Sequence, residues 1–142
     1  MTTTQQATQQ ATERMLFVNL PVTDPAATRA FWSDLGFTIN EAFSDERAVS
    51  VQLNSLTSVM FLEHAYFHSF HGTTAPTSGT GALYCLSAGS ADDVRALVER
   101  ALDLGGSAAG EPQENGPMVG WSFRDLDGQI WEVMWMDPAA LG

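Results

Sequence analysis

Lysine is absent from the sequence, and 17 acidic residues outnumber the six arginines, which gives a formal net charge of -11. Proteins that bind nucleic acid neutralise phosphates with clustered basic residues, and anionic membranes attract basic segments. We therefore expect neither nucleic acid nor a membrane as a partner. The simplest interpretation of the excess charge is a solvated acidic surface, with only weak support for a cationic partner.

Cysteine and long apolar runs are also scarce. The single cysteine, Cys85, excludes a disulfide within the chain and suits a reducing compartment, so we expect a cytoplasmic protein. Between Tyr84 and Leu86, its side chain is expected to fill core space rather than act as a nucleophile. No apolar run approaches the length of a membrane span. Residues 1–13 lack the basic and apolar regions of a signal peptide and predict a disordered tail.

Strand and helix patterns are present twice, in the same order. The first set is a strand at 15–22, a helix at 26–35 and strands at 37–43, 48–53 and 58–63. The second set is a strand at 82–88, a helix that begins after Ser90 and ends before Gly105, and strands at 107–110, 118–124 and 129–136. The sequence therefore predicts an α+β fold with two tandem β-α-β-β-β modules, at about 15–64 and 81–137. A linker at 65–80 joins them within one domain, residues 14–142.

Two glutamates are the candidate catalytic residues. Glu63 lies 27 residues after Gly36, and Glu132 lies 27 residues after Gly105, so the repeat relates them. Glu132 follows an Asp-Leu-Asp-Gly turn in an alternating apolar strand, where a carboxylate is costly unless it is paired, protonated or bound to a cation. The alternative is a structural carboxylate satisfied by arginine or backbone. We interpret Arg124 and Asp125, at the start of the turn, as a surface pair.

Aromatic and methionine side chains are candidates for lining a pocket, with ordinary core packing as the alternative. The ligand-binding candidates are Phe17, Met60, Phe61, Met118, Trp121, Trp131 and Met134. The three histidines, His64, His68 and His71, would share one face of a helix, which makes them either a metal site or a surface turn.

Several motifs in this arrangement resemble those of the vicinal oxygen chelate superfamily, which includes glyoxalase I, extradiol dioxygenases and bleomycin resistance proteins. They are Val22-Thr23-Asp24, Ala30-Phe31-Trp32, Leu35-Gly36-Phe37 and the run from Asp125 to Glu132. Runs such as Phe17–Val22 and Trp131–Asp137 resemble its glyoxalase-like branch, related to lactoylglutathione lyase. The resemblance implies curved sheets around a small-molecule cavity between the modules, and a homodimer.

The resemblance also implies where a divalent metal would bind. Metal-dependent members carry His or Gln on the first strand of each module and Glu on the last. Here Phe17 and Leu83 stand at the first-strand positions, whereas Glu63 and Glu132 match the carboxylates. We therefore predict small-molecule binding without the full ligand set and without a cofactor. The alternatives are a divalent-metal-dependent lyase, isomerase or dioxygenase that uses Glu63 and Glu132, and a purely structural or interaction module.

Overall fold

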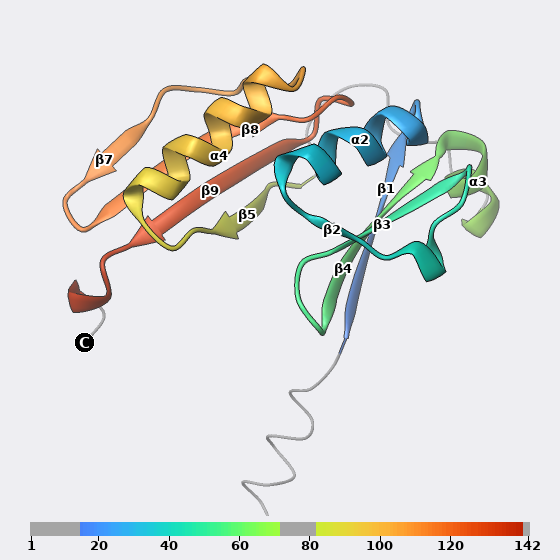
Figure 1. The fold of residues 1–142 in the computed structure, drawn as a ribbon, viewed down its shortest axis with the longest axis horizontal. Helices are drawn as coiled ribbons and strands as arrows, with labels where there is room; N and C mark the ends of the chain where they lie inside the picture. Colours follow the sequence, from blue (N-terminus) through green and yellow to red (C-terminus); the bar gives the residue numbers. More distant parts are fainter. Residues whose placement is uncertain (1–14, 72–81, 141–142) are drawn as a thin grey trace, which may run out of the picture. The chain divides into compact units, whose positions relative to one another are not determined.

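The computed structural model describes residues 15–71 and 82–140 of the 142-residue chain. The predicted tail and most of the predicted linker lie outside these residues. The chain divides into two compact units, residues 1–75 and 76–142, and each is described by itself (Figure 1). Within the two described ranges, no helix is long and apolar enough to cross a membrane.

The first unit is a four-stranded mixed sheet with strand order β1-β4-β3-β2. The edge strand β1 runs parallel to β4, and the other neighbours are antiparallel. Its elements are β1 (Leu16–Val22), α2 (Pro25–Leu35), β2 (Thr38–Ile39), the 3-10 helix η1 (Glu41–Phe43), β3 (Ala48–Gln52), β4 (Thr57–Glu63) and α3 (His64–His71).

The second unit repeats this plan with strand order β5-β9-β8-β6, and β7 also pairs with β8. Its first strand, β5, again runs parallel to the last strand, β9. The elements are β5 (Tyr84–Ser87), α4 (Ala91–Asp103), β6 (Ser107–Ala108), β7 (Gln113–Asn115), β8 (Met118–Arg124), β9 (Ile130–Met136) and the 3-10 helix η2 (Pro138–Ala140). The predicted α+β class and the internal repeat are confirmed.

Capping residues set the ends of both long helices. The Asp24 side chain accepts a hydrogen bond from Ala27 N (3.2 Å), and α2 stops at Gly36, whose φ of 109° is left-handed. In the second unit, Ser90 Oγ accepts from Asp93 N (3.0 Å). These caps fix where each helix starts on its sheet.

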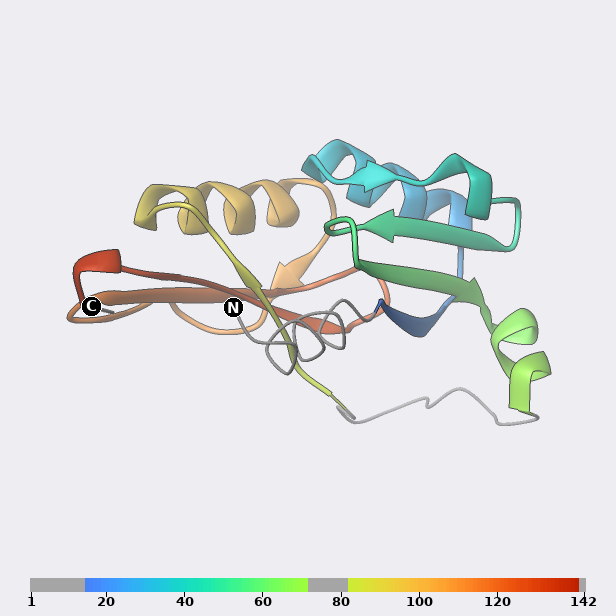
Figure 2. The same cartoon turned by 90° about the horizontal axis from the view of Figure 1, so that it is seen from below.

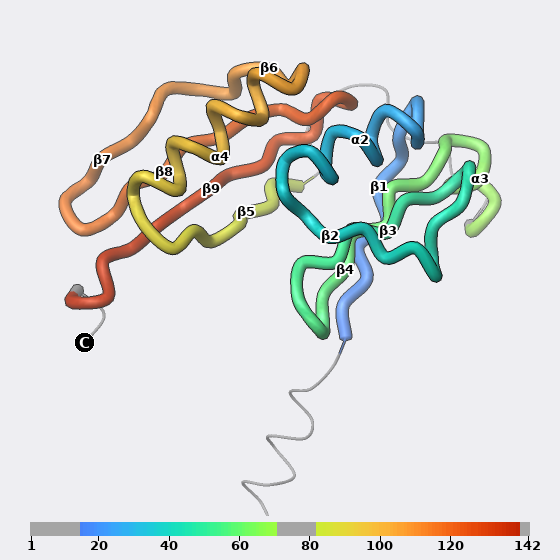
Figure 3. The backbone as a smooth tube through the Cα atoms, viewed as in Figure 1, coloured from blue at the N-terminus to red at the C-terminus, as the bar shows by residue number. Residues whose placement is uncertain are grey.

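The predicted strand at 37–43 is wrong beyond Ile39. The Asn40 side chain accepts a hydrogen bond from Ala42 N (3.1 Å) and starts η1, so the chain turns away from the sheet (Figure 3). Asparagine competes in this way with strand pairing, because its amide oxygen offers the backbone a local partner. The strand β7 was not predicted, since Gln113, Glu114 and Asn115 carry no apolar alternation and are all exposed.

Each sheet has one face covered by its helix. In the first unit, Trp32 of α2 stacks on Phe61 of β4, with ring centroids 5.4 Å apart. In the second, α4 lies along β8 and β9 (Figure 2), and Phe123, Trp131 and Val133 are fully buried beneath it. Because strand side chains alternate, the intervening residues point to the opposite side of the sheet. We call the two sides of each sheet the helix face and the far face.

Candidate functional site

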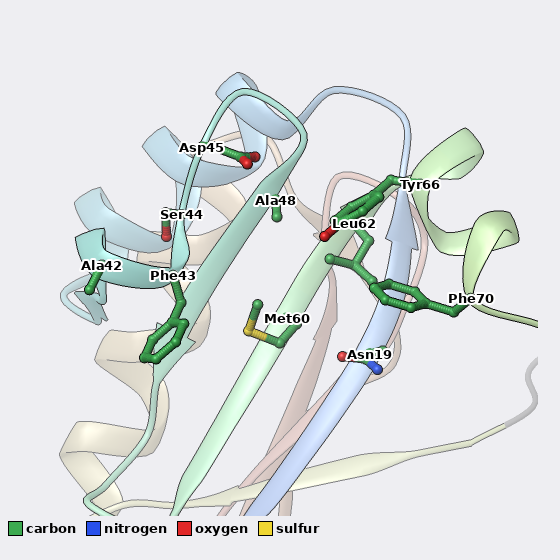
Figure 4. Close-up of a pocket in the computed structure, with 10 residues that line it drawn as sticks. All are labelled: Asn19, Ala42, Phe43, Ser44, Asp45, Ala48, Met60, Leu62, Tyr66 and Phe70. Carbon is green, nitrogen blue, oxygen red and sulfur yellow. The ribbon is translucent and has the colours of Figure 1, made fainter.

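A pocket of about 280 Å³ lies on the far face of the first sheet (Figure 4). The strands β1, β3 and β4 form its floor, α3 forms one wall, and η1 with the following loop forms the other. Its lining residues are Asn19, Ala42, Phe43, Ser44, Asp45, Ala48, Met60, Leu62, Tyr66 and Phe70. Every one of them belongs to the first unit.

The pocket surface is mainly apolar and aromatic. Tyr66 and Phe70, one turn apart on α3, contact each other with ring centroids 5.0 Å apart. Phe43 faces the pocket from the opposite wall and is exposed. Such walls suit an apolar or aromatic ligand, whose orientation a few polar groups then fix.

Besides the Tyr66 hydroxyl, three polar side chains line the same pocket. The Ser44 hydroxyl is already engaged, because it donates to Asn40 O (2.7 Å) and accepts from Ser50 N (3.0 Å). Asp45 Oδ1 accepts from Arg47 N (2.8 Å), which tightens the turn into β3. Asn19 is exposed on β1, beside Met60. Asp45 and Asn19 are therefore the groups best placed to meet a polar part of a ligand.

The structure separates the predicted site residues between the two kinds of face. The far faces carry Phe17 and Met60 in the first unit, and Glu132, Met118 and Met134 in the second. The helix faces carry Glu63, Phe61, Trp121 and Trp131. Phe61 and Trp131 are each 1% exposed, so they belong to the cores under the helices. Only Met60 of the whole set lines the pocket.

Strand register shows why the residue count misaligned the glutamates. Glu132 pairs with Cys85 of the first strand of its unit, and Met60 pairs with Asn19 of the first strand of its own. The hairpins that precede these residues agree, since their closing pairs are Gln52↔Ser58 and Arg124↔Ile130. Met60 and Glu132 each lie two residues after the closing pair of their hairpin. Glu63 instead lies at the end of β4, on the helix face. Met60 is therefore the structural counterpart of Glu132.

The prediction that Cys85 fills the core is wrong, because its side chain is exposed on the far face of β5. Partial burial, together with the negative charge of Glu132, raises the pKa of the Cys85 thiol. Glu132 itself is exposed. Thus the carboxylate that was expected to be enclosed by apolar residues lies on an accessible surface of its unit.

Replacing Glu132→Gln should speed alkylation of Cys85 by iodoacetamide at about pH 8, because loss of the neighbouring charge lowers the thiol pKa and raises the thiolate fraction. The difference should vanish at a pH where both proteins are fully thiolate. Glu99→Gln, an exposed change on α4, serves as the control and should have no effect. Equal alkylation rates in the Glu132 variant and the wild type would contradict the position of Cys85 and Glu132 side by side on the far face.

The turn after β8 is structural and differs from the predicted surface pair. Asp125 is 7% exposed, and its carboxylate accepts hydrogen bonds from the backbone N of Asp127 and Gln129 (3.0 Å each) and from Trp131 Nε1 (2.9 Å). Burial raises the pKa of the Asp125 carboxyl, and these hydrogen bonds counteract part of the rise. Gly128, with φ of 85°, completes the predicted turn. Asp125 therefore holds β9 in place rather than pairing with Arg124.

The residues do not fit a catalytic divalent metal. Among residues 15–71 and 82–140, no three His, Cys, Asp or Glu side chains cluster closely enough to hold an ion. The register puts Met60 in the place of Glu63, so the four implied ligand positions become Phe17, Met60, Glu132 and Leu83, which directly precedes β5. A catalytic metal normally takes three or more protein ligands, and only Glu132 has a suitable side chain.

Two tandem β-α-β-β-β units, each with a parallel pair between its first and last strands, define a glyoxalase-type fold. The chain belongs to the Glyoxalase/Bleomycin resistance protein/Dioxygenase superfamily, whose family model matches residues 14–133. No curated protein matches the sequence.

Three solved structures illustrate the likeness. A hypothetical protein from S. aureus is 27% identical, with a TM-score of 0.74 over 85% of this chain and 91% of that one. A glyoxalase-related enzyme from Fulvimarina pelagi is 17% identical, with a TM-score of 0.76 over 86% and 87%. TnmS3, an antibiotic binding protein from Streptomyces sp. CB03234, is 21% identical, with a TM-score of 0.62 over 87% and 95%. The last two likenesses show a shared fold.

Proposed function

We propose that this protein binds a small, largely apolar molecule in the pocket on the far face of the first sheet, and sequesters it without a metal. The pocket itself carries the proposal, since apolar strand residues and three aromatic rings converge there beside a few polar groups. Membership of a superfamily that includes bleomycin resistance proteins supports a binding role. A structural neighbour described as an antibiotic binding protein is compatible with it.

The size of the pocket limits the ligand. Sites for drug-sized molecules usually measure about 300–1,000 Å³. At about 280 Å³, this pocket suits a compact ligand, or one ring-bearing part of a larger molecule. A panel of small aromatic compounds and antibiotics, screened by thermal shift, should therefore yield stabilising ligands, because binding to the folded state raises the melting temperature.

Phe43→Ala should weaken binding of a ligand from that screen by roughly tenfold, because it removes one aromatic wall. Calorimetric titration measures the change. Leu56→Ala is the matched control, an exposed apolar residue of the same unit that does not line the pocket. Both residues are exposed, so stability should change little in either variant. Equal affinities in the two variants would place the ligand elsewhere.

A metal-dependent lyase is the competing function, and the accessible Glu132 is the observation that favours it. Such an enzyme would convert a hemithioacetal substrate when supplied with Zn²⁺, Ni²⁺ or Mn²⁺ and would lose that activity in Glu132→Gln. The binding proposal instead expects no turnover with any of these metals. Metal-dependent turnover that is lost in Glu132→Gln would refute the binding proposal in favour of the lyase.

The proposal also includes a cytoplasmic homodimer. The dimer rests on the resemblance of the chain to its superfamily. Sedimentation at micromolar concentration should show twice the 15.3 kDa chain mass. A species of single-chain mass alone would remove the dimer from the proposal.

A further inference from the structure

We infer that the ligand of this pocket is an organic cation, an ammonium group carried on a compact apolar or aromatic body. This inference rests on the proposed function and specifies the chemical class of ligand. Its first support is the composition of the lining: among the ten residues that line the pocket, Asp45 is the one acidic residue, and none is basic. An anionic ligand would meet this carboxylate without a compensating positive group in the lining.

Asp45 is positioned to receive such a group. One carboxylate oxygen, Oδ1, accepts from Arg47 N, which anchors the side chain at the pocket wall. The second oxygen has no hydrogen bond among the described residues. Asp45 is exposed, so a ligand can reach this oxygen from solvent. An ammonium group at the mouth of the pocket would gain a charge-assisted contact while its apolar body rests on Met60 and Leu62.

The aromatic walls favour the same class of ligand. Cations are attracted to the faces of aromatic rings, and cages of such rings recognise quaternary ammonium groups. The Tyr66 ring already accepts one cation, because the guanidinium carbon of Arg47 lies 4.4 Å from its centroid. Phe43 and Phe70 offer further ring surface around the same space. Because the Arg47 guanidinium already covers one face of Tyr66, Phe43 and Phe70 are the rings that a ligand cation would meet.

The charge of the whole chain acts in the same direction at longer range. A net charge of -11 and the absence of lysine raise the local concentration of small cations around the protein. This part of the attraction is screened by salt, whereas the contact with Asp45 is screened less at close range. Cation binding should therefore weaken with ionic strength but persist at about 0.15 M salt.

The test uses two probes of the same shape, 4-hydroxyphenyltrimethylammonium and 4-tert-butylphenol, and the anion 4-hydroxybenzenesulfonate. Titration followed by amide NMR shifts gives both affinity and location. We expect the ammonium probe to bind about tenfold more tightly than 4-tert-butylphenol. The shifts should centre on Phe43, Asp45, Met60 and Tyr66, and the sulfonate should bind most weakly.

Asp45→Asn supplies the decisive variant, because asparagine keeps the oxygen that accepts from Arg47 N and removes only the charge. It should remove most of the preference for the ammonium probe and leave binding of 4-tert-butylphenol unchanged. Glu46→Gln is the control: it changes the net charge equally at the next residue, which does not line the pocket. It should reduce ammonium binding less than about twofold. Melting temperatures should match the wild type in both variants.

The outcomes separate the two proposals. If none of the three probes, nor any compound of the wider panel, perturbs the pocket residues, the proposed function itself fails. If the two isosteric probes bind equally, or if the sulfonate binds best, the inferred cation is wrong while binding in this pocket stands. Equal losses of affinity for the ammonium probe in Asp45→Asn and Glu46→Gln would also overturn the inference. The preference for a cation would then come from the overall negative charge of the protein and not from a contact with Asp45.

Discussion

Trp32→Ala should lower the free energy of unfolding by about 3–5 kcal/mol, the usual cost of deleting a large buried aromatic side chain. Trp32 is 1% exposed and contacts the rings of Phe31, Phe37 and Phe61 at centroid distances of 5.2–5.5 Å. Its removal leaves a cavity between α2 and β4 that neighbouring side chains cannot fill. Urea denaturation followed by far-UV circular dichroism measures the loss.

The control is Trp121→Ala in the second unit, where the ring is only half-buried and its Nε1 donates to Gly110 O (2.9 Å). A clearly smaller loss is expected there, and equal losses would contradict Trp32 as the centre of the first core. The Trp32→Ala variant also tests the prediction that residues 14–142 form one domain. In a single cooperative domain, both units of Trp32→Ala lose amide protection together; in separable units, only the first does.

Asp125→Ala should destabilise the protein by roughly 1–3 kcal/mol or more, because it removes the carboxylate that accepts a hydrogen bond from a buried indole N–H. Trp131 is 1% exposed, so its Nε1 is shielded from bulk water in the folded protein. The turn also loses the acceptor of the backbone N of Asp127 and Gln129. Asp127→Ala, an exposed change in the same turn, should cost less than about 0.5 kcal/mol. Similar losses in both variants would contradict this role.

The cost of Asp125→Ala should also depend on pH. Burial raises the pKa of the Asp125 carboxyl above its ordinary value of 3.8, so the folded state disfavours the charged form. The stability that this group contributes is therefore complete below the ordinary pKa and declines as pH rises through the folded pKa. The destabilisation measured at about pH 4 should accordingly exceed that at about pH 8. An unchanged or opposite difference would show that the hydrogen bonds outweigh burial.

The repeat was readable from the sequence because caps and turns mark it locally. Asp24 and Ser90 begin helices, Gly36 ends one, and the Asp125 turn positions the strand that follows. These features depend on residues close together in the chain, so sequence reasoning finds them. Which residues of a strand lie on which face of the sheet depends on the register between strands that are distant in sequence. Counting residues across loops of unequal length does not reveal that register. Glu63 was matched to Glu132 for that reason, whereas the register matches Met60.

The pocket could not be predicted from the sequence. Its walls come from η1 and α3, which only the fold brings to the same sheet face. The strand predicted over 37–43 concealed η1 and therefore the position of Phe43. One signal was available: Asn40 and Asp45 flank this segment as residues that cap and turn the backbone.

The pairing of the first and last strands determines when each sheet can form while the chain is being synthesised. In each unit the last strand lies in the interior of the sheet, with β1 and β3 flanking β4, and β5 and β8 flanking β9. The first sheet can therefore close as soon as β4 has left the exit tunnel, while the second sheet cannot close before β9 has emerged. Until β9 emerges, β5 and β8 have no partner between them. A nascent chain stalled within 130–136 would expose two unpaired strand edges, which are the surfaces that chaperones protect from aggregation.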